Sequence, residues 1–146
     1  MKDRILDPSS DHYRDYGIIA ALCTHSDTHK RWSANDLMRL FMAPILLNQY
    51  RIFYDQKRPV GFVTWALFGE DAVKAYVGRT RKLQPIDFHS GNQVWVIDLV
   101  APFGGTREIV RDMRKYLSDR YPQQRAHWIR NSQTPNRRLG YGARRS

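Results

Sequence analysis

An apolar stretch interrupted by one carboxylate, Val94 to Val100, constrains this chain more than any other feature. Its Val and Ile content, with Asn92 before it and Pro102 after it, is typical of a strand buried on both faces of a sheet. A charged side chain in such a strand costs several kcal/mol unless it is paired or hydrogen-bonded. Asp98 therefore needs a partner from another part of the chain.

A glycine turn follows this strand directly. Phe103-Gly104-Gly105 breaks the extended backbone, and the spacing of the apolar residues after it predicts a helix from Thr106 to about Ser118. Glu108 in its first turn and Arg114 in its last turn complement the helix dipole. Strand, glycine turn and helix N-terminus together offer backbone N–H groups to a phosphate or a carbonyl oxygen.

The rest of the chain predicts an α+β domain in which helices flank a mostly antiparallel central sheet. Ser33 is a good N-cap for a helix that Pro44 should bend or end. We treat residues 1–146 as a single domain with mobile ends at 1–15 and 132–146. The other expected elements are a helix over 17–23, a hairpin of strands 49–55 and 60–68, a helical turn over 72–77 and a last strand over 126–131.

Charge indicates an acidic partner. The formal net charge is +10, and no acidic side chain follows Asp119, whereas arginines continue to Arg145. Nucleic acid, a phosphorylated cofactor and an acidic protein all fit such a surface. The single cysteine, Cys23, excludes an internal disulfide, and no apolar run is long enough to cross a bilayer or to act as a signal segment. We therefore expect a cytoplasmic protein.

Several patches, in the same order along the chain, resemble the toxin-activating lysine acyltransferases, enzymes that attach fatty acyl groups to lysines of RTX protoxins. The resemblance covers about Tyr16 to Tyr116. It rests on Gly17 through Leu22, Ser26-Asp27-Thr28-His29-Lys30-Arg31-Trp32, Pro44, Asn48-Gln49-Tyr50, Pro59 through Ala66, Ser90-Gly91 and Trp95 through Gly105.

The resemblance implies a fold related to the GNAT acyltransferases and a His/Asp catalytic pair. By motif these residues are His29 and Asp98, with Ser26 as a further candidate. It also implies that the co-substrate is an acyl-acyl-carrier-protein, a phosphopantetheine thioester, with no tightly bound cofactor. The acceptor would be an RTX-type protoxin or a smaller ribosomal peptide, and a homodimer stays open because relatives form dimers.

The chemistry of lysine acylation fits this pair. With a reference pKa of roughly 10.4, only about one lysine side chain in two thousand is neutral at pH 7, so a base is needed. Histidine suits that task, and a buried carboxylate behind it fixes the tautomer and stabilises the imidazolium. We assign His29 as the base and Asp98 as the residue that orients it.

The donor should bind along the end of the Asp98 strand. Backbone groups near Ala101 and Phe103 are candidates for stabilising the oxyanion. Gly104 and Gly105 would meet the phosphate of the carrier at the helix N-terminus. Arg107 and Arg111 are the nearest basic residues for docking an acidic carrier protein. The acyl chain needs apolar walls, for which Trp65 and Trp95 are candidates.

Other interpretations remain open. A polar-loop His and a buried strand Asp are often purely structural, and Ser26 can simply cap a helix. His25 and His29 are spaced like a metal pair, but no third ligand is evident, so we expect no metal. Cys23 could accept an acyl group, although its apolar neighbours favour an inert thiol. Two rival functions are an acyl-CoA-dependent GNAT-type N-acyltransferase and a small basic nucleic-acid-binding protein, the latter not expected because no recognisable module is present.

Overall fold

One five-stranded sheet organises the computed structural model, which describes residues 8–130 and 138–142. Among these residues the β1–β2, β2–β3 and β4–β5 pairs are antiparallel, and β3–β4 is parallel. The predicted α+β class with a mostly antiparallel sheet is therefore confirmed. The strands lie in chain order: β1 (Tyr50–Asp55), β2 (Arg58–Phe68), β3 (Gln93–Val100), β4 (Ala126–Arg130) and β5 (Arg138–Gly142).

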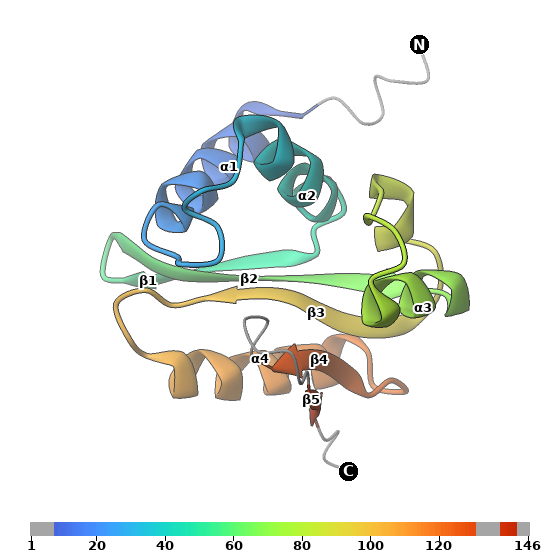
Figure 1. Ribbon diagram of the computed structural model, residues 1–146. Coiled ribbons are helices and arrows are strands. Elements are labelled where there is room, and N and C mark those ends of the chain that lie inside the picture. The colour runs from blue at the N-terminus through green and yellow to red at the C-terminus, as the bar shows by residue number, and fades with distance from the viewer. Residues whose placement is uncertain (1–7, 131–137, 143–146) are drawn as a thin grey trace.

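The first helices cover one face of the sheet (Figure 1). They are α1 (Ser10–Cys23), α2 (Ala34–Leu46) and α3 (Glu70–Gly78), with the short 3-10 helix η2 (Pro85–Phe88) beside them. Ile19 of α1 and Phe41 of α2 are fully buried against Phe62 of β2 and Val100 of β3. The loop between α1 and α2 is thereby held over the end of β3.

Helix α4 (Thr106–Arg120) covers the opposite face and connects β3 to β4 (Figure 1). A parallel pair of strands requires such a crossover connection. The side chains of Ile109, Met113 and Leu117, one helical turn apart, are 4–5% exposed and pack on β2 and β3. Burying each contributes about 1.5–3 kcal/mol, which ties α4 firmly to the sheet.

Helix α1 begins earlier than the sequence predicts. A lead-in was expected as far as residue 15, but the helix starts at Ser10 because Ser9 and His12 form a capping box. The Oγ atom of Ser9 accepts the His12 N–H at 3.2 Å, and His12 Nδ1 accepts the Ser9 N–H at 3.0 Å. Residues 10–15 of the predicted mobile end thus belong to α1, and residues 1–7 lie outside the described part.

Within the stretch predicted to be a mobile C-terminal end, residues 138–142 form β5. The rest of the stretch 132–146 lies outside the described residues. Between β2 and β3, the predicted helical turn is the full helix α3, whereas η2 was not predicted. Ser33 does cap α2, and that helix ends two residues after Pro44.

No helix within residues 8–130 or 138–142 combines the length and the apolar character that a membrane crossing requires.

Candidate active site

His29 lies in a tightly wound loop between α1 and α2. The carbonyl of Ser26 accepts the backbone N–H groups of His29 and Lys30 at 3.1 and 2.8 Å, so Ser26 and His29 stand one turn apart on the same side of the loop. The imidazole is only 4% exposed and packs between the rings of Trp32 and Phe41, whose centroids lie 4.7 and 5.7 Å away. Although the segment is polar, its histidine is buried.

Asp98 reaches this loop because β3 contains a bulge. Val96 pairs with Trp65 and Asp98 with Thr64, so Ile97 is an extra residue. Before the bulge, Val94 and Val96 pack toward α4. Strict alternation would place position 98 on that same face, but the inserted residue returns Asp98 to the face that carries α1 and α2. Bulges commonly re-aim a side chain beside an active site in this way.

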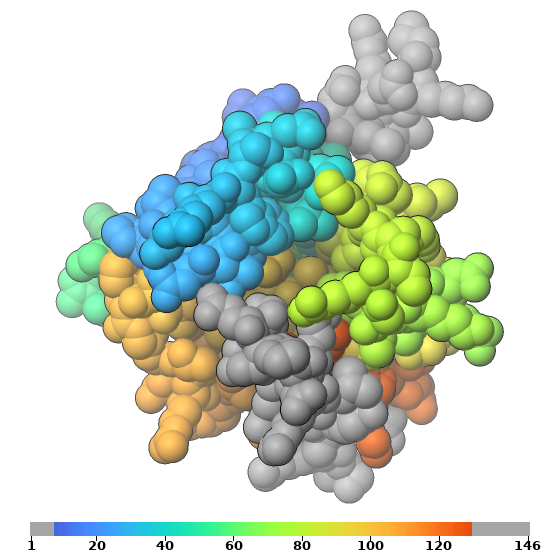
Figure 2. All heavy atoms as spheres, in the orientation of Figure 1, coloured from blue at the N-terminus to red at the C-terminus, as the bar shows by residue number. Residues whose placement is uncertain are grey.

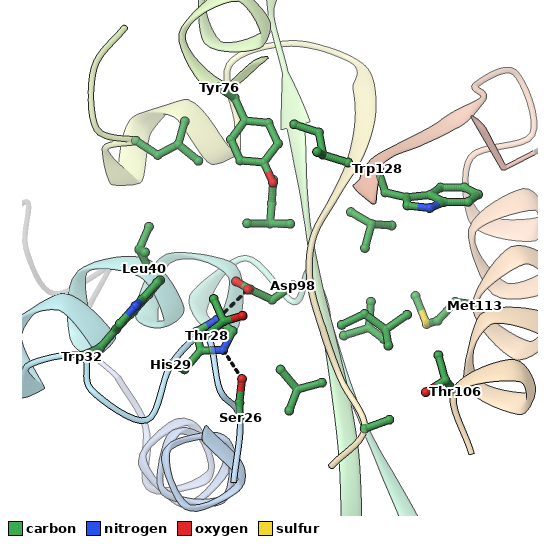
Figure 3. A pocket seen from close by; sticks show the side chains of 18 of the residues that line it. Ser26, Thr28, His29, Trp32, Leu40, Tyr76, Asp98, Thr106, Met113 and Trp128 are labelled. Atoms are coloured by element: carbon green, nitrogen blue, oxygen red, sulfur yellow. Dashed lines mark hydrogen bonds and ion pairs between the residues drawn. The ribbon is translucent and has the colours of Figure 1, made fainter. Parts of the chain in front are cut away.

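The two segments meet through a continuous chain of hydrogen bonds. His29 Nε2 lies 2.8 Å from Asp98 Oδ1, and His29 Nδ1 lies 2.7 Å from Ser26 Oγ (Figure 3). An ionised carboxylate only accepts hydrogen bonds, so Nε2 carries the proton and donates it to Asp98. The lone pair of Nδ1 then accepts the hydroxyl proton of Ser26. The structure thus brings together the three predicted residues, although His29 and Asp98 are 69 positions apart in the sequence.

This group opens into a cleft of about 1290 Å³. Figure 2 shows part of β3 at the bottom of a hollow between the α1–α2 segment and α3. Pairing between β3 and β4 stops at Val96 and Trp128, yet β3 continues to Val100. Residues 97–100 therefore present a backbone edge that β4 leaves unpaired, and all of them line the cleft.

The glycine turn has the expected geometry at the helix N-terminus. Gly104 and Gly105 have φ angles of +95° and +81°, and Gly105 is the N-cap of α4. Side chains rarely adopt such angles, so glycine is needed here. Ala101 and Thr106 line the cleft near this turn.

Phe103 and the two predicted docking arginines lie at the surface. The Phe103 ring is 48% exposed, 5.2 Å from the His25 ring, with the Arg58 guanidinium 4.9 Å away. These contacts tie the turn to the His29 loop and to the β1–β2 hairpin. Arg107 and Arg111 are exposed on α4, and no ion pair within the described part of the chain involves them.

Trp65 and Trp95 do not line the cleft, contrary to the prediction of an acyl-pocket role. Trp65 is fully buried under α4 and donates its indole N–H to Tyr121 Oη at 3.1 Å. Trp95 is 3% exposed on the other face, stacked on His127. Because side chains alternate between the two faces of a strand, the two rings lie in the core on opposite faces of the sheet. The apolar lining comes instead from residues that sequence reasoning missed: Trp32, Leu40, Tyr76, Val110, Met113, Leu117 and Trp128.

Tyr76 is the clearest of the missed residues. Burial raises the pKa of its phenol above the usual range and the nearby Asp98 charge adds to this, so the group stays neutral. Burial likewise raises the pKa of the Cys23 thiol to about 12, with a smaller contribution from Asp98. Cys23 is 1% exposed, which supports the inert thiol over an acyl-accepting one.

Comparison with known proteins decides the family. The sequence profile of the RTX toxin acyltransferase family matches residues 9–139, nearly the whole chain. The chain belongs to this family.

Characterised members of the RTX toxin acyltransferase family are similar over much of the chain. The lysine-acyltransferase RtxC of Vibrio cholerae is 31% identical over 100 residues, which cover 68% of this chain and 65% of RtxC. The protein-lysine palmitoyltransferase CyaC of Bordetella bronchiseptica is 34% identical over 118 residues, which cover 81% of this chain and 62% of CyaC. The RTX-II toxin-activating lysine-acyltransferase ApxIIC of Actinobacillus pleuropneumoniae is 32% identical over 99 residues, covering 68% and 62%. The chain spans less than two thirds of the length of each of these relatives.

Proposed function

We propose that this protein transfers a fatty acyl group from the thioester of an acyl carrier protein to a lysine amine of a protein acceptor. One observation carries the proposal: a partly buried Ser26–His29–Asp98 hydrogen-bond chain opens into a cleft beside the edge of β3 that β4 leaves unpaired. Family membership supports the reaction class. The names of the relatives favour an RTX-type toxin as acceptor, and a smaller ribosomal peptide is the alternative.

The hydrogen-bond directions suggest the path of the proton. Because Nδ1 of His29 already accepts from Ser26, the lysine ammonium passes its proton to Ser26 Oγ while that hydroxyl gives its own proton to Nδ1. The neutral amine attacks the thioester carbonyl, the N–C bond forms, and the C–S bond then breaks. The imidazolium, stabilised by Asp98, gives its proton to the thiolate of the carrier. The neutral His29 then takes, through Ser26, the second proton from the newly bonded nitrogen and releases it to solvent, so that an ammonium and a thioester become an amide, a thiol and one free proton.

The sheet supports a GNAT-like arrangement of the donor. In the GNAT fold, pantetheine lies against the strand equivalent to β3, and here residues 97–100 line the cleft with a backbone edge that β4 leaves unpaired, opposite the edge that pairs with β2. The donor phosphate would lie at the N-terminus of α4, where Gly104 and Gly105, both with positive φ, carry no side chain that would crowd it. The Gly104 N–H already donates to the Ala101 carbonyl at 3.2 Å, so the phosphate would meet the N–H groups of the first turn of α4. An acidic carrier protein would dock over Arg107 and Arg111.

The decisive experiment measures transfer by intact-mass spectrometry. The protein is incubated with palmitoyl-acyl carrier protein, or with palmitoyl-CoA, and a candidate protoxin, and a fatty-acyl mass increment on the acceptor is recorded. We expect transfer from the carrier protein and a loss of roughly 10²–10⁴-fold in His29→Gln. The exposed His89 offers a matched control, because His89→Gln removes a histidine outside the cleft.

The choice of substitution matters because His29 is buried. The loop position predicts that His29→Ala leaves the fold intact, but the imidazole is packed between two aromatic rings and bonded to Asp98. Removing it would leave a cavity and an unpaired carboxylate. Gln fills more of this space. Turnover at the wild-type rate in folded His29→Gln would disprove the assigned base.

A further inference from the structure

The two faces of β3 give the cleft two chemically different halves. On the His29 side the lining includes Trp32, Leu40 and Leu83 together with four cationic side chains: Arg39, Arg79, Arg81 and Lys82. On the other side lies a surface that we call the α4 wall, composed of Val63, Val96, Val110, Met113, Leu117, Ala126 and Trp128. Figure 3 shows Met113 and Trp128 across β3 from His29, Trp32 and Leu40.

The α4 wall is apolar along its whole length. The ionisable side chain of α4 that borders it in the cleft is Arg114, whose guanidinium lies 5.6 Å from the Trp128 ring. A hydrocarbon chain gains free energy in proportion to the apolar area it removes from water. The His29 side would instead place that chain against four charged groups, whose desolvation opposes binding.

Helix α4 runs back along β3, so the wall extends away from the donor phosphate site. Ile109 is level with Val100, because a Cβ atom added to Gly61 would lie 2.7 Å from the Val100 carbonyl oxygen and 2.9 Å from Ile109 Cδ1. Further along, Arg114 contacts Trp128, which pairs with Val96. Asp98 stands between these two levels.

We infer that the acyl chain of the donor lies on the α4 wall, passing from a thioester beside Asp98 over Val96 and along the cleft-facing atoms of Met113, Leu117 and Trp128. The inference rests on the proposed function and adds the binding site of the acyl group. At Val96 and Trp128 the paired strands close the gap in the sheet, so the chain must turn to one face. The charges direct it to the α4 face.

Photo-crosslinking tests this placement in the unmodified protein. The probe is an acyl carrier protein loaded with a palmitoyl chain that carries a diazirine at its terminal carbon. Trypsin separates the two halves of the cleft: residues 112–114, 116–120 and 126–130 report the α4 wall, whereas 40–51 and 75–79 report the His29 side. We expect saturable labelling of the peptides that report the α4 wall. Palmitoyl-acyl carrier protein without the diazirine should suppress this labelling.

Labelling confined to residues 40–51 or 75–79 would overturn the inference while leaving the proposed transferase reaction standing. Absence of saturable labelling anywhere, together with no acyl transfer, would instead contradict the proposed function. These two failures are therefore distinguishable.

A variant adds a functional measurement. Met113→Trp should narrow the cleft beside the α4 wall. The ratio of kcat/KM for palmitoyl donors to kcat/KM for octanoyl donors should then fall by roughly tenfold, which corresponds to the burial of about two methylene groups. Met38→Trp is the matched control, because Met38 is 41% exposed on α2 and lies outside the cleft. Thermal unfolding verifies that both variants fold. An unchanged ratio in folded Met113→Trp would count against the α4 wall.

Discussion

At the scale of single residues, Thr64 is the unexplained neighbour of the candidate site. It stands directly opposite Asp98 in the β2–β3 ladder, is 1% exposed, and its Oγ1 atom has no hydrogen-bond partner within the described part of the chain. A buried hydroxyl without a partner costs about 1–3 kcal/mol relative to a satisfied one. On the opposite strand, Asp98 Oδ1 is already engaged by His29.

Replacing this hydroxyl should stabilise the fold. Thr64→Val keeps the β-branched shape, removes the unpaired polar atom, and should raise the free energy of unfolding by about 1 kcal/mol. Urea denaturation followed by tryptophan fluorescence measures the change. Thr64→Ser is the matched control, since it keeps the hydroxyl and loses the methyl group, and it should be destabilised. A less stable Thr64→Val would mean that the hydroxyl has a partner in solution.

Cys23 should be unreactive in the folded protein. With a pKa raised to about 12 by burial, the thiol is less than about one part in a thousand thiolate at pH 8, and only the thiolate is nucleophilic. We expect iodoacetamide at pH 8 to leave the native protein unmodified and to alkylate the urea-unfolded chain, as intact mass would show. Rapid native alkylation would reopen Cys23 as an acyl acceptor.

The sequence predicts a site residue correctly where its charge alone requires a partner, and incorrectly where packing decides which way the side chain points. The need for a partner at Asp98 follows from its charge in an apolar strand, and the partner is His29. The bulge at Ile97 could not be predicted, because strict alternation places position 98 with Val94 and Val96. The predicted role of Trp65 and Trp95 in the acyl pocket is wrong for a related reason. Alternation along the strands does not tell where the cleft lies, so it does not tell whether either ring reaches it.

At the scale of elements, the start of α4 depends on Gly105. Its φ of +81° lies in the left-handed region, and an ideal Cβ there would meet nothing closer than 3.9 Å, so backbone conformation and not space requires glycine. Gly105→Ala should lower the free energy of unfolding by about 1 kcal/mol. Gly17→Ala is the matched control, with an expected effect of opposite sign. Because Gly17 lies inside α1 with open space around it, alanine there should raise the free energy of unfolding by roughly 0.5–1 kcal/mol. Urea denaturation of both variants tests the pair, and equal effects would contradict this account.

The start of α1 was not predicted because a local hydrogen-bond pattern, and not hydrophobic spacing, determines where this helix begins. Residues 8–15 carry few apolar side chains, so hydrophobic spacing gives no helix there. The Ser9–His12 capping box nevertheless satisfies backbone donors at that end, with a histidine where Glu or Gln is usual. For α4, by contrast, apolar spacing and the glycine turn agree, and the helix was predicted to within two residues of its end.

At the scale of the whole molecule, the cleft depends on a long-range pairing that no local pattern contains. The α+β class follows from the order of elements, but a final strand over 126–131 does not reveal whether it pairs in parallel with β3. Only that pairing, closed at Val94–Val96 and open beyond, exposes the strand edge beside Asp98. The positive charge, in contrast, is evident from composition before any fold is known.

That charge makes a prediction about encounter with the donor. Arg107, Arg111 and Arg114 share one exposed face of α4, beside the cleft. None of the three arginines forms an ion pair with another described residue. Such a stripe raises the association rate of an acidic partner at low ionic strength, and salt screens this attraction over a Debye length of about 8–10 Å. Binding of acyl carrier protein, followed by calorimetry, should therefore weaken steadily as NaCl rises.

Charge reversal separates this local effect from net charge. The double variant Arg107→Glu/Arg111→Glu should weaken carrier binding about tenfold or more at low salt and flatten its salt dependence, because like charges across an interface repel. Lys57→Glu/Lys74→Glu lowers the net charge equally at exposed positions that do not line the cleft. If both double variants lose affinity to the same degree, the protein attracts its partner through overall charge alone. A loss confined to the α4 variant locates the carrier beside the N-terminus of that helix, where its phosphopantetheine can reach the edge of β3.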